Sequence, residues 1–264
     1  MKKLFFISLI LFSGMLSLLA GTGNDKGLKS VKGKHVLIYT KNGEGYVHDN
    51  IAASVKALNE ICSEMGISAD VTDDPAKFTD GNLKKYDALI FTNTNNKVFD
   101  TDEQKKALQN FIRAGGGFVA IHSANATERD WPWMWSMVGG KFIRHAPHQQ
   151  FDVLVTDANH PSTSFLPKTW TVNDECYYSN QLNPDIHVLL SADLRTIEDK
   201  GKDEYPGETF GHLFPLCWCH EFDGGREWYS ALGHDIEFYD DPIFRKHLAG
   251  GILWVLGVEN VDLK

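Results

Sequence analysis

The segment Gly115–Asn125 constrains the fold of this chain more than any other stretch of it. It reads Gly-Gly-Gly-Phe-Val-Ala-Ile-His-Ser-Ala-Asn, so that glycines lead into an apolar run that ends at His122. A continuous apolar run is typical of a strand buried on both faces of a parallel sheet. In open α/β sheets, ligands bind at the carboxyl ends of such strands. His122 is therefore a candidate site residue, and the alternative is a histidine that hydrogen-bonds a neighbouring loop.

The first half of the chain alternates between strand and helix patterns. Strands are predicted over residues 35–40, 67–72, 86–92 and 118–121. One helix is predicted between Asp49, a good N-cap, and Gly66, and another after Thr101, which forms a capping box with Gln104. This rhythm predicts an α/β fold with a doubly wound sheet flanked by helices.

The second half is less regular and shows no internal repeat or linker. Strand-like alternation is present over residues 151–155, 169–173, 187–191, 214–218 and 227–232. A closing helix is predicted from Pro242, which suits a first helical turn. We expect a single domain over residues 34–258.

The N-terminus has the layout of a secretory signal peptide. Lys2 and Lys3 precede an apolar run that ends in small residues at Ala20 and Gly21. Serines and a glycine dilute this run, which is short for a membrane span. We expect residues 1–20 to be cleaved, residues 21–33 to form a tether, and the mature chain to be exported to the periplasm or the extracellular space with no membrane segment.

The net charge disfavours nucleic-acid binding, and the cysteine spacing disfavours a disulfide between neighbouring cysteines. The formal net charge of -9 disfavours a broad nucleic-acid-binding surface. Of the four cysteines, Cys217 and Cys219 would point to the same face of one strand, where bridging is geometrically poor. Buried free thiols are therefore expected.

Polar residues gather at several predicted strand ends. The histidines next to turns or strand ends are His48, His122, His145, His212 and His234. The carboxylates Asp174 and Glu175 directly follow another strand. Imidazole and carboxylate are ligands that zinc accepts, and a catalytic zinc site keeps one position open. No fixed-spacing motif such as HExxH is present, so the ligands would have to converge from distant segments.

These patterns predict a site for acid–base chemistry. We expect His122, His145 and His234 to hold a divalent metal, zinc or manganese, and Glu175, Asp174 and His122 to be catalytic. The residues expected to contact substrate are His48, Ser123, Asn125, Trp133 and Tyr177. No nucleotide cofactor is expected.

Several of these residues have a purely structural alternative. His48 could simply precede a helix cap, and Asp174 could cap a local turn while Glu175 carries the chemistry. The tryptophans within residues 131–135 could stack on a sugar ring or form a lid on the core. His148 is interpreted as a surface-loop residue.

Ordered motifs along the chain carry a resemblance to a known family. They are Phe118–Ala124, Gly139–His145, His160-Pro161, Asp174–Tyr177, Pro215–Trp218, Gly225–His234 and Asp241–His247. Together they resemble the ThuA-like (trehalose utilisation) family, over about residues 34–257. The resemblance implies a flavodoxin-like, mostly parallel sheet like that of class I glutamine amidotransferases. It also implies a role in carbohydrate catabolism, linked to trehalose and 3-keto sugar derivatives.

The chain departs from the amidotransferase pattern where those enzymes carry a nucleophilic cysteine. The strand-to-helix elbow here reads Ile121-His122-Ser123, without a thiol. A Cys–His glutaminase is therefore disfavoured. Ser123 lacks the flanking glycines of a Gly-x-Ser-x-Gly elbow, which also disfavours a serine hydrolase.

Two functions of different classes remain open. The first is an exported enzyme that acts on a trehalose-type or 3-keto sugar derivative by acid–base chemistry, with or without a metal. The second is a carbohydrate-binding protein without catalysis. A subunit that supports a partner sugar oxidoreductase is compatible with the sequence but has no direct support in it.

Overall fold

The computed structural model describes residues 30–201, 211–259 and 263. The predicted signal peptide and most of the tether lie outside these residues. At the end of the tether, Val31 is fully buried. No helix in the described ranges is long and apolar enough to cross a membrane.

The described chain contains eleven strands and five α-helices. The strands are β1 (His35–Tyr39), β2 (Ser68–Thr72), β3 (Ala88–Thr92), β4 (Gly117–Ile121), β5 (Lys141–His145), β6 (Gln149–Val155), β7 (Thr169–Asp174), β8 (Tyr177–Asn180), β9 (His187–Asp193), β10 (Leu213–Phe222) and β11 (Gly225–Ser230). The α-helices are α2 (Ile51–Glu64), α3 (Asp80–Leu83), α4 (Asp102–Arg113), α5 (Pro132–Val138) and α6 (Pro242–Val255). Short 3-10 turns are η1 (Pro75–Lys77), η2 (His122–Ala126), η3 (Leu194–Thr196) and η6 (Glu237–Asp240).

Nine strands form one sheet in the order β2-β1-β3-β4-β11-β10-β9-β6-β7. The first five pair in parallel, and their order is that of a flavodoxin-like sheet with β11 in the fifth place. The other four extend the sheet through antiparallel pairs, while β5 and β8 pair separately. The predicted α/β fold with helices around a parallel central sheet is confirmed.

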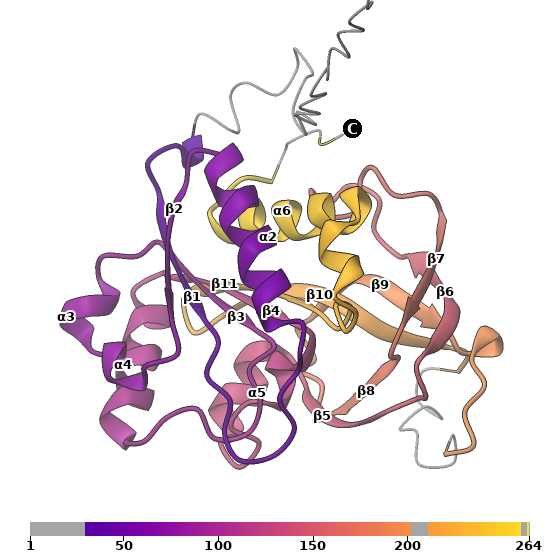
Figure 1. Cartoon of the computed structure of the whole chain (residues 1–264), viewed down its shortest axis with the longest axis horizontal. Helices are drawn as coiled ribbons and strands as arrows, with labels where there is room; N and C mark the ends of the chain where they lie inside the picture. The colour runs from indigo at the N-terminus through magenta and orange to yellow at the C-terminus, as the bar shows by residue number, and fades with distance from the viewer. Residues whose placement is uncertain (1–29, 202–210, 260–262, 264) are drawn as a thin grey trace, which may run out of the picture.

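Helices cover both faces of the parallel strands. In Figure 1, α2 and α6 lie on one face and α3, α4 and α5 on the other. The central strands β3 and β4 are buried along their whole length, as their continuous apolar sequences predict. Helix α4 begins with the predicted capping box between Thr101 and Gln104, and α6 begins at Pro242 behind the cap formed by Asp241.

After the antiparallel strands, the chain returns to the parallel part of the sheet through β11. Strand β10 returns through a tight turn at Asp223 and Gly224 into β11, which pairs with β4. The edge strand β7 packs on α6, where the rings of Trp170 and His247 are 6.0 Å apart. The end of β7 lies near the carboxyl end of β11, because Asp174 accepts the N–H of Gly233 at 2.8 Å, although the two strands are not neighbours in the sheet.

All four cysteines are buried free thiols, as predicted. Burial raises the pKa of Cys217 well above its ordinary value and that of Cys62 to about 12. Neutral thiols at this depth act as small apolar side chains.

Candidate functional site

The first component of the site is His122, at the carboxyl end of β4. It is fully buried and has a φ of 54°, a left-handed conformation that is uncommon outside glycine and that occurs at functional sites. Its Nδ1 donates to the carbonyl of Ala231 over 2.7 Å. A carbonyl oxygen only accepts, so Nδ1 carries the proton and Nε2 presents a lone pair. Tyr177 Oη donates to that Nε2 over 2.9 Å.

His234 lies after β11, in a segment held from both sides. Asp174 accepts the backbone N–H of Gly233 at 2.8 Å and that of His234 at 3.3 Å. Asn50 Nδ2 donates to the carbonyls of the same two residues, each over 2.7 Å. Tyr239 Oη also donates to the Gly233 carbonyl. The backbone that carries His234 is thereby fixed by residues from β7, from the start of α2 and from η6.

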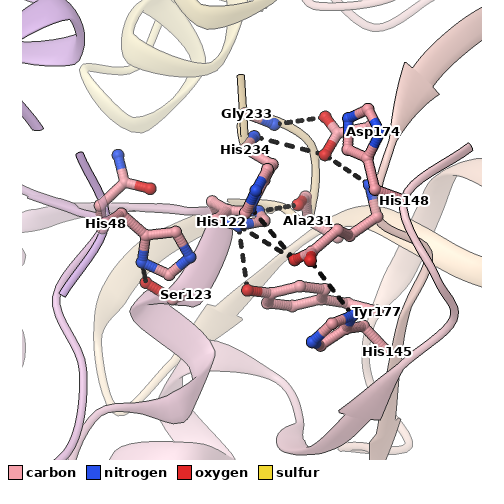
Figure 2. Close-up of polar contacts among 12 residues, drawn as sticks. His48, His122, Ser123, His145, His148, Asp174, Tyr177, Ala231, Gly233 and His234 are labelled. Carbon is pink, nitrogen blue, oxygen red and sulfur yellow. Dashed lines mark hydrogen bonds and ion pairs between the residues drawn. The ribbon is translucent and has the colours of Figure 1, made fainter. Parts of the chain in front are cut away.

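His48 lies on the loop between β1 and α2 and faces the other two imidazoles. Its ring centroid is 4.8 Å from that of His122 and 5.4 Å from that of His234. Its Nδ1 contacts Ser123 Oγ at 3.3 Å, which leaves Nε2 on the side of the other rings (Figure 2). Burial, and then the nearby His234, lower the pKa of His48 to about 4. Burial likewise holds the pKa of His122 well below its usual value, so both rings are neutral at pH 7.

Glu175 supplies the carboxylate of the site. Its Oε2 lies 3.2 Å from His234 Nδ1 and 3.9 Å from His122 Nε2, and its Oε1 lies 3.2 Å from His145 Nδ1. Burial by itself would raise the pKa of Glu175, but the hydrogen bond from His234 and the charges of His145 and His234 bring it below its usual value. The same hydrogen bond raises the pKa of His234.

His48, His122, His234 and Glu175 form a group that could hold a metal ion. One ligand atom from each residue lies within 4.8 Å of those of the other three. Three imidazoles and a carboxylate are a donor set that zinc, manganese and related divalent ions accept. Metal-binding histidines commonly donate their second ring N–H to a carbonyl, as His122 does to Ala231. The donor set therefore fits a metal, and we call these four residues the histidine–glutamate cluster.

Asp174 has a different place from Glu175. It is fully buried. In addition to the backbone N–H groups of Gly233 and His234, it accepts the N–H of Glu175 at 2.7 Å. Burial raises its pKa to about 7, although the N–H groups of Gly233 and Glu175 favour the charged form. Both carboxylate oxygens accept hydrogen bonds from backbone N–H groups, so the role of Asp174 is to position His234 and Glu175.

The predicted substrate residues divide into two groups. Ser123 and Tyr177 touch the cluster through His48 and His122. Asn125 is buried nearby on η2 and donates to Ser179 Oγ at 3.0 Å, while its own Oδ1 is buried and has no hydrogen-bond partner among the described residues. Trp133 is not brought to the cluster.

Trp133, near the start of α5, lies at the opposite edge of the sheet. Its indole donates to Asp223 at 3.1 Å, in the turn that precedes β11. Its ring stacks on Trp131 with a centroid separation of 5.1 Å and meets Phe222 edge-on. These contacts match the alternative reading of the tryptophans as a cover for the core.

The remaining histidines lie around or away from the cluster. His145 contacts Glu175 from outside, with Nδ1 also 2.9 Å from the Ala146 carbonyl, and it is not among the four clustered ligands. His148 pairs with Asp235 at 2.9 Å. His212 is exposed in the turn before β10.

Comparison with known proteins places the chain in a family. The model of the ThuA family, described as trehalose utilisation, matches residues 35–255. The chain belongs to the ThuA family. No curated protein matches it. This membership supports a carbohydrate-related role.

Solved structures show the same fold at low identity. A ThuA-like protein from Bacteroides uniformis is 23% identical with a TM-score of 0.68, and the match covers 86% of this chain and 92% of that one. A second ThuA-like protein, from Parabacteroides merdae, is 18% identical with a TM-score of 0.66 and coverages of 87% and 91%. A β-galactosidase from Bacillus circulans sp. alkalophilus is 15% identical with a TM-score of 0.53, and the match covers 86% of this chain but 31% of that chain. These similarities concern the fold.

Three residues of the site escaped the sequence reasoning. Asn50 lies beside the predicted helix cap at Asp49, Tyr239 lies outside the predicted elements, and Ala231 acts only through its carbonyl. Asn50 was the one residue with a signal, since a polar side chain at a helix start can cap. In the structure its side chain makes no helix-capping hydrogen bond and instead donates to the carbonyls of Gly233 and His234, which follow β11.

Proposed function

We propose that this ThuA-family chain is an exported, metal-dependent enzyme that acts on a trehalose-type or 3-keto sugar derivative. The observation that carries the proposal is the histidine–glutamate cluster at the carboxyl edge of the parallel strands. Convergent titratable groups with shifted pKa values are characteristic of active sites. Export is supported by the signal-peptide pattern of residues 1–20.

In this proposal His48, His122 and His234 hold the metal, and Glu175, the fourth residue of the cluster, acts as the base instead of as a ligand. His122 and His48 present neutral rings, and with the proton on His122 Nδ1 it is the Nε2 lone pair, which accepts from Tyr177 Oη in the structure, that would bind the metal. A bound divalent ion would supply Lewis-acid stabilisation of negative charge on a substrate oxygen. Glu175, ionised at neutral pH, removes a proton from the carbon next to the sugar ketone.

Two neighbours complete the acid–base set. His145 contacts Glu175 Oε1, so it orients the carboxylate and leaves Oε2 toward the cluster. Burial raises the pKa of Tyr177 well above its ordinary value, so its hydroxyl remains protonated and can donate to a leaving or forming oxygen. Proton removal beside a ketone permits elimination, isomerisation or glycoside cleavage.

Metal content tests the proposal directly. The chain without residues 1–20, purified without chelators or a histidine tag, should carry about one equivalent of zinc or manganese, or take it up when supplied. His122→Ala should lose that metal. His220→Ala is the matched control, because His220 is also buried and bonded to a carbonyl, that of Met137, but lies outside the cluster.

The opposite outcomes point to different functions. Wild-type protein that stays metal-free with zinc and manganese supplied would remove the metal from the proposal. If the same protein binds trehalose or 3-keto-trehalose and returns it unchanged, the chain is a carbohydrate-binding protein.

A further inference from the structure

Large apolar side chains are exposed on the two chain segments that carry His48 and His234 of the cluster. The exposed large hydrophobic residues of the described chain are Tyr46, Val47, Val71, Ile236 and Ile243. Tyr46 and Val47 directly precede His48, and Ile236 follows His234 by two residues. Three of the five thus flank the cluster, and Tyr46, at 61%, is the most exposed of them.

Tyr46 is held in place by its surroundings. Its ring meets His48 edge-on, with centroids 4.8 Å apart. Its carbonyl accepts from Asn95 Nδ2 at 3.2 Å, and Asn96 Nδ2 binds the Glu44 carbonyl two residues earlier. Asn96 has a φ of 58°, so the β3 loop adopts an uncommon conformation to make this contact. The Tyr46 ring is therefore anchored beside the cluster while most of its surface faces solvent.

The Tyr46 hydroxyl has no hydrogen-bond partner among the residues that the structure describes. The Tyr46 ring lies directly beside His48, one of the four residues of the cluster, while 61% of the residue remains exposed. Tyr46 thus spans from the solvent to the neighbourhood of the cluster.

We infer that Tyr46 is the platform of a sugar-ring subsite, with Val47 beside it, that presents a substrate ring to the cluster. This inference rests on the proposed function. A pyranose ring has an apolar face of C–H groups and an edge of hydroxyl groups. An anchored aromatic ring suits the first, because its face accepts C–H contact, and the histidines and carboxylate of the cluster suit the second.

The chemistry of the surroundings favours a small sugar over a protein partner. The exposed apolar side chains are few and adjoin polar groups, including Asp235 and His148, which pair at 2.9 Å. Protein interfaces use larger continuous apolar patches. Ligand sites instead combine an apolar wall with a few convergent polar groups. The subsite also takes the role that the sequence suggested for Trp133.

The test measures binding and turnover separately, with trehalose and 3-keto-trehalose as probes. Tyr46→Ala should leave metal content unchanged and weaken the binding of at least one probe about tenfold, which corresponds to about 1.4 kcal/mol. Tyr46→Phe, which keeps the ring, should bind within about threefold of wild type. Val71→Ala, at an exposed apolar position on β2, is the control and should bind as wild type does.

The outcomes separate the subsite from the catalytic proposal. Probe binding that depends on the Tyr46 ring, without turnover by the metal-loaded wild type, supports the subsite and overturns the enzyme. Turnover with the KM of Tyr46→Ala unchanged overturns the subsite and leaves the enzyme standing. If neither probe binds the wild type, the sugar-ring subsite is wrong.

Discussion

The two edges of the same parallel strands differ in how they form their turns and in what they expose. At the carboxyl edge, left-handed backbone conformations include four residues with side chains, Asn93, Asn96, His122 and Glu128, besides the positive-φ glycines Gly45 and Gly233. At the amino edge, they belong mainly to glycines, such as Gly115, Gly224 and Gly257, with Asp223 as an exception. Glycine adopts this conformation without strain, whereas other residues keep it only where their surroundings enforce it.

Cavity volume does not single out the edge that carries the histidine–glutamate cluster. A cavity of about 560 Å³ lies at the amino edge and is lined by Lys34, Asp87, Glu221, Arg226 and several glycines. Its charged groups are partly exposed and pair with one another, as Lys34 does with Asp87 at 2.7 Å. The cluster at the carboxyl edge instead brings buried, unlike groups onto one point. Convergence of buried groups therefore marks the edge that carries the cluster better than cavity volume does.

The largest effect should come from exchanging one carboxylate at each edge. Glu175→Gln should lower the turnover of 3-keto-trehalose by about 10²–10⁴-fold, the usual contribution of a general base, while metal is retained. Glu221→Gln, on the amino-edge cavity, should leave turnover unchanged. Steady-state kinetics with elemental analysis of each variant checks both. Loss of metal from Glu175→Gln would make Glu175 a ligand and require another base.

The next effect concerns aspartates that bind backbone at each edge. Asp174→Asn should weaken metal binding about 10–100-fold, because it disturbs the N–H contacts that position His234 and Glu175. Asp87→Asn, which disturbs the contact with the His35 N–H, should leave metal affinity unchanged. Competition with a metal-binding dye measures both. Equal affinities in the two variants would show that the backbone contacts of Asp174 do not set the cluster.

Glycines with positive φ sharpen the contrast in stability. In Gly233→Ala the new Cβ would lie 2.8 Å from Tyr239 Oη in a backbone with a φ of 124°, so we expect a loss of about 2–3 kcal/mol in unfolding free energy. Gly257→Ala meets no atom within 4 Å and should lose about 1 kcal/mol. Urea denaturation compares the two. A smaller loss for Gly233→Ala would mean that the site loop yields easily.

The last prediction concerns His247, a buried histidine of the core outside the cluster. Burial lowers the pKa of His247 to about 4, so the folded state keeps this ring neutral while the unfolded state takes up a proton below pH 6.5. Stability is therefore complete above pH 6.5 and falls toward pH 4, by about 1.4 kcal/mol per pH unit for this residue. His247→Gln should reduce that slope by one proton. Urea titrations across this range measure it, and an unchanged slope would exclude His247 as a source.

Much of the fold could be predicted because its signals are local. The apolar run Phe118–Ile121 and the capping box at Thr101 act within a few residues, and both appear as expected. The parallel placement of β11 was not predictable in this way, since it depends on β10 turning back at Gly224 after a long antiparallel excursion.

The site could be predicted only as a set of strand-end residues. His122 and His234 follow apolar strands in the sequence, and they meet because parallel strands end at one edge. His145, expected as a metal ligand, instead contacts the outer oxygen of Glu175. No local sequence pattern distinguishes a histidine that belongs to the four-residue cluster from one, such as His145, that contacts only its carboxylate.

The sequence by itself determined the strand and helix segments and the polar residues at their ends, because hydrophobic periodicity and capping act over one or two turns. Only the tertiary structure decided that Asn50 and Asp174 fix the His234 backbone, that Ala231 sets the proton on His122, and which four side chains converge. The hydrogen bonds from Asn50 to Gly233 and from His122 to Ala231 join residues more than 100 positions apart. Such contacts exist only once the packed sheet has brought its distant strands together.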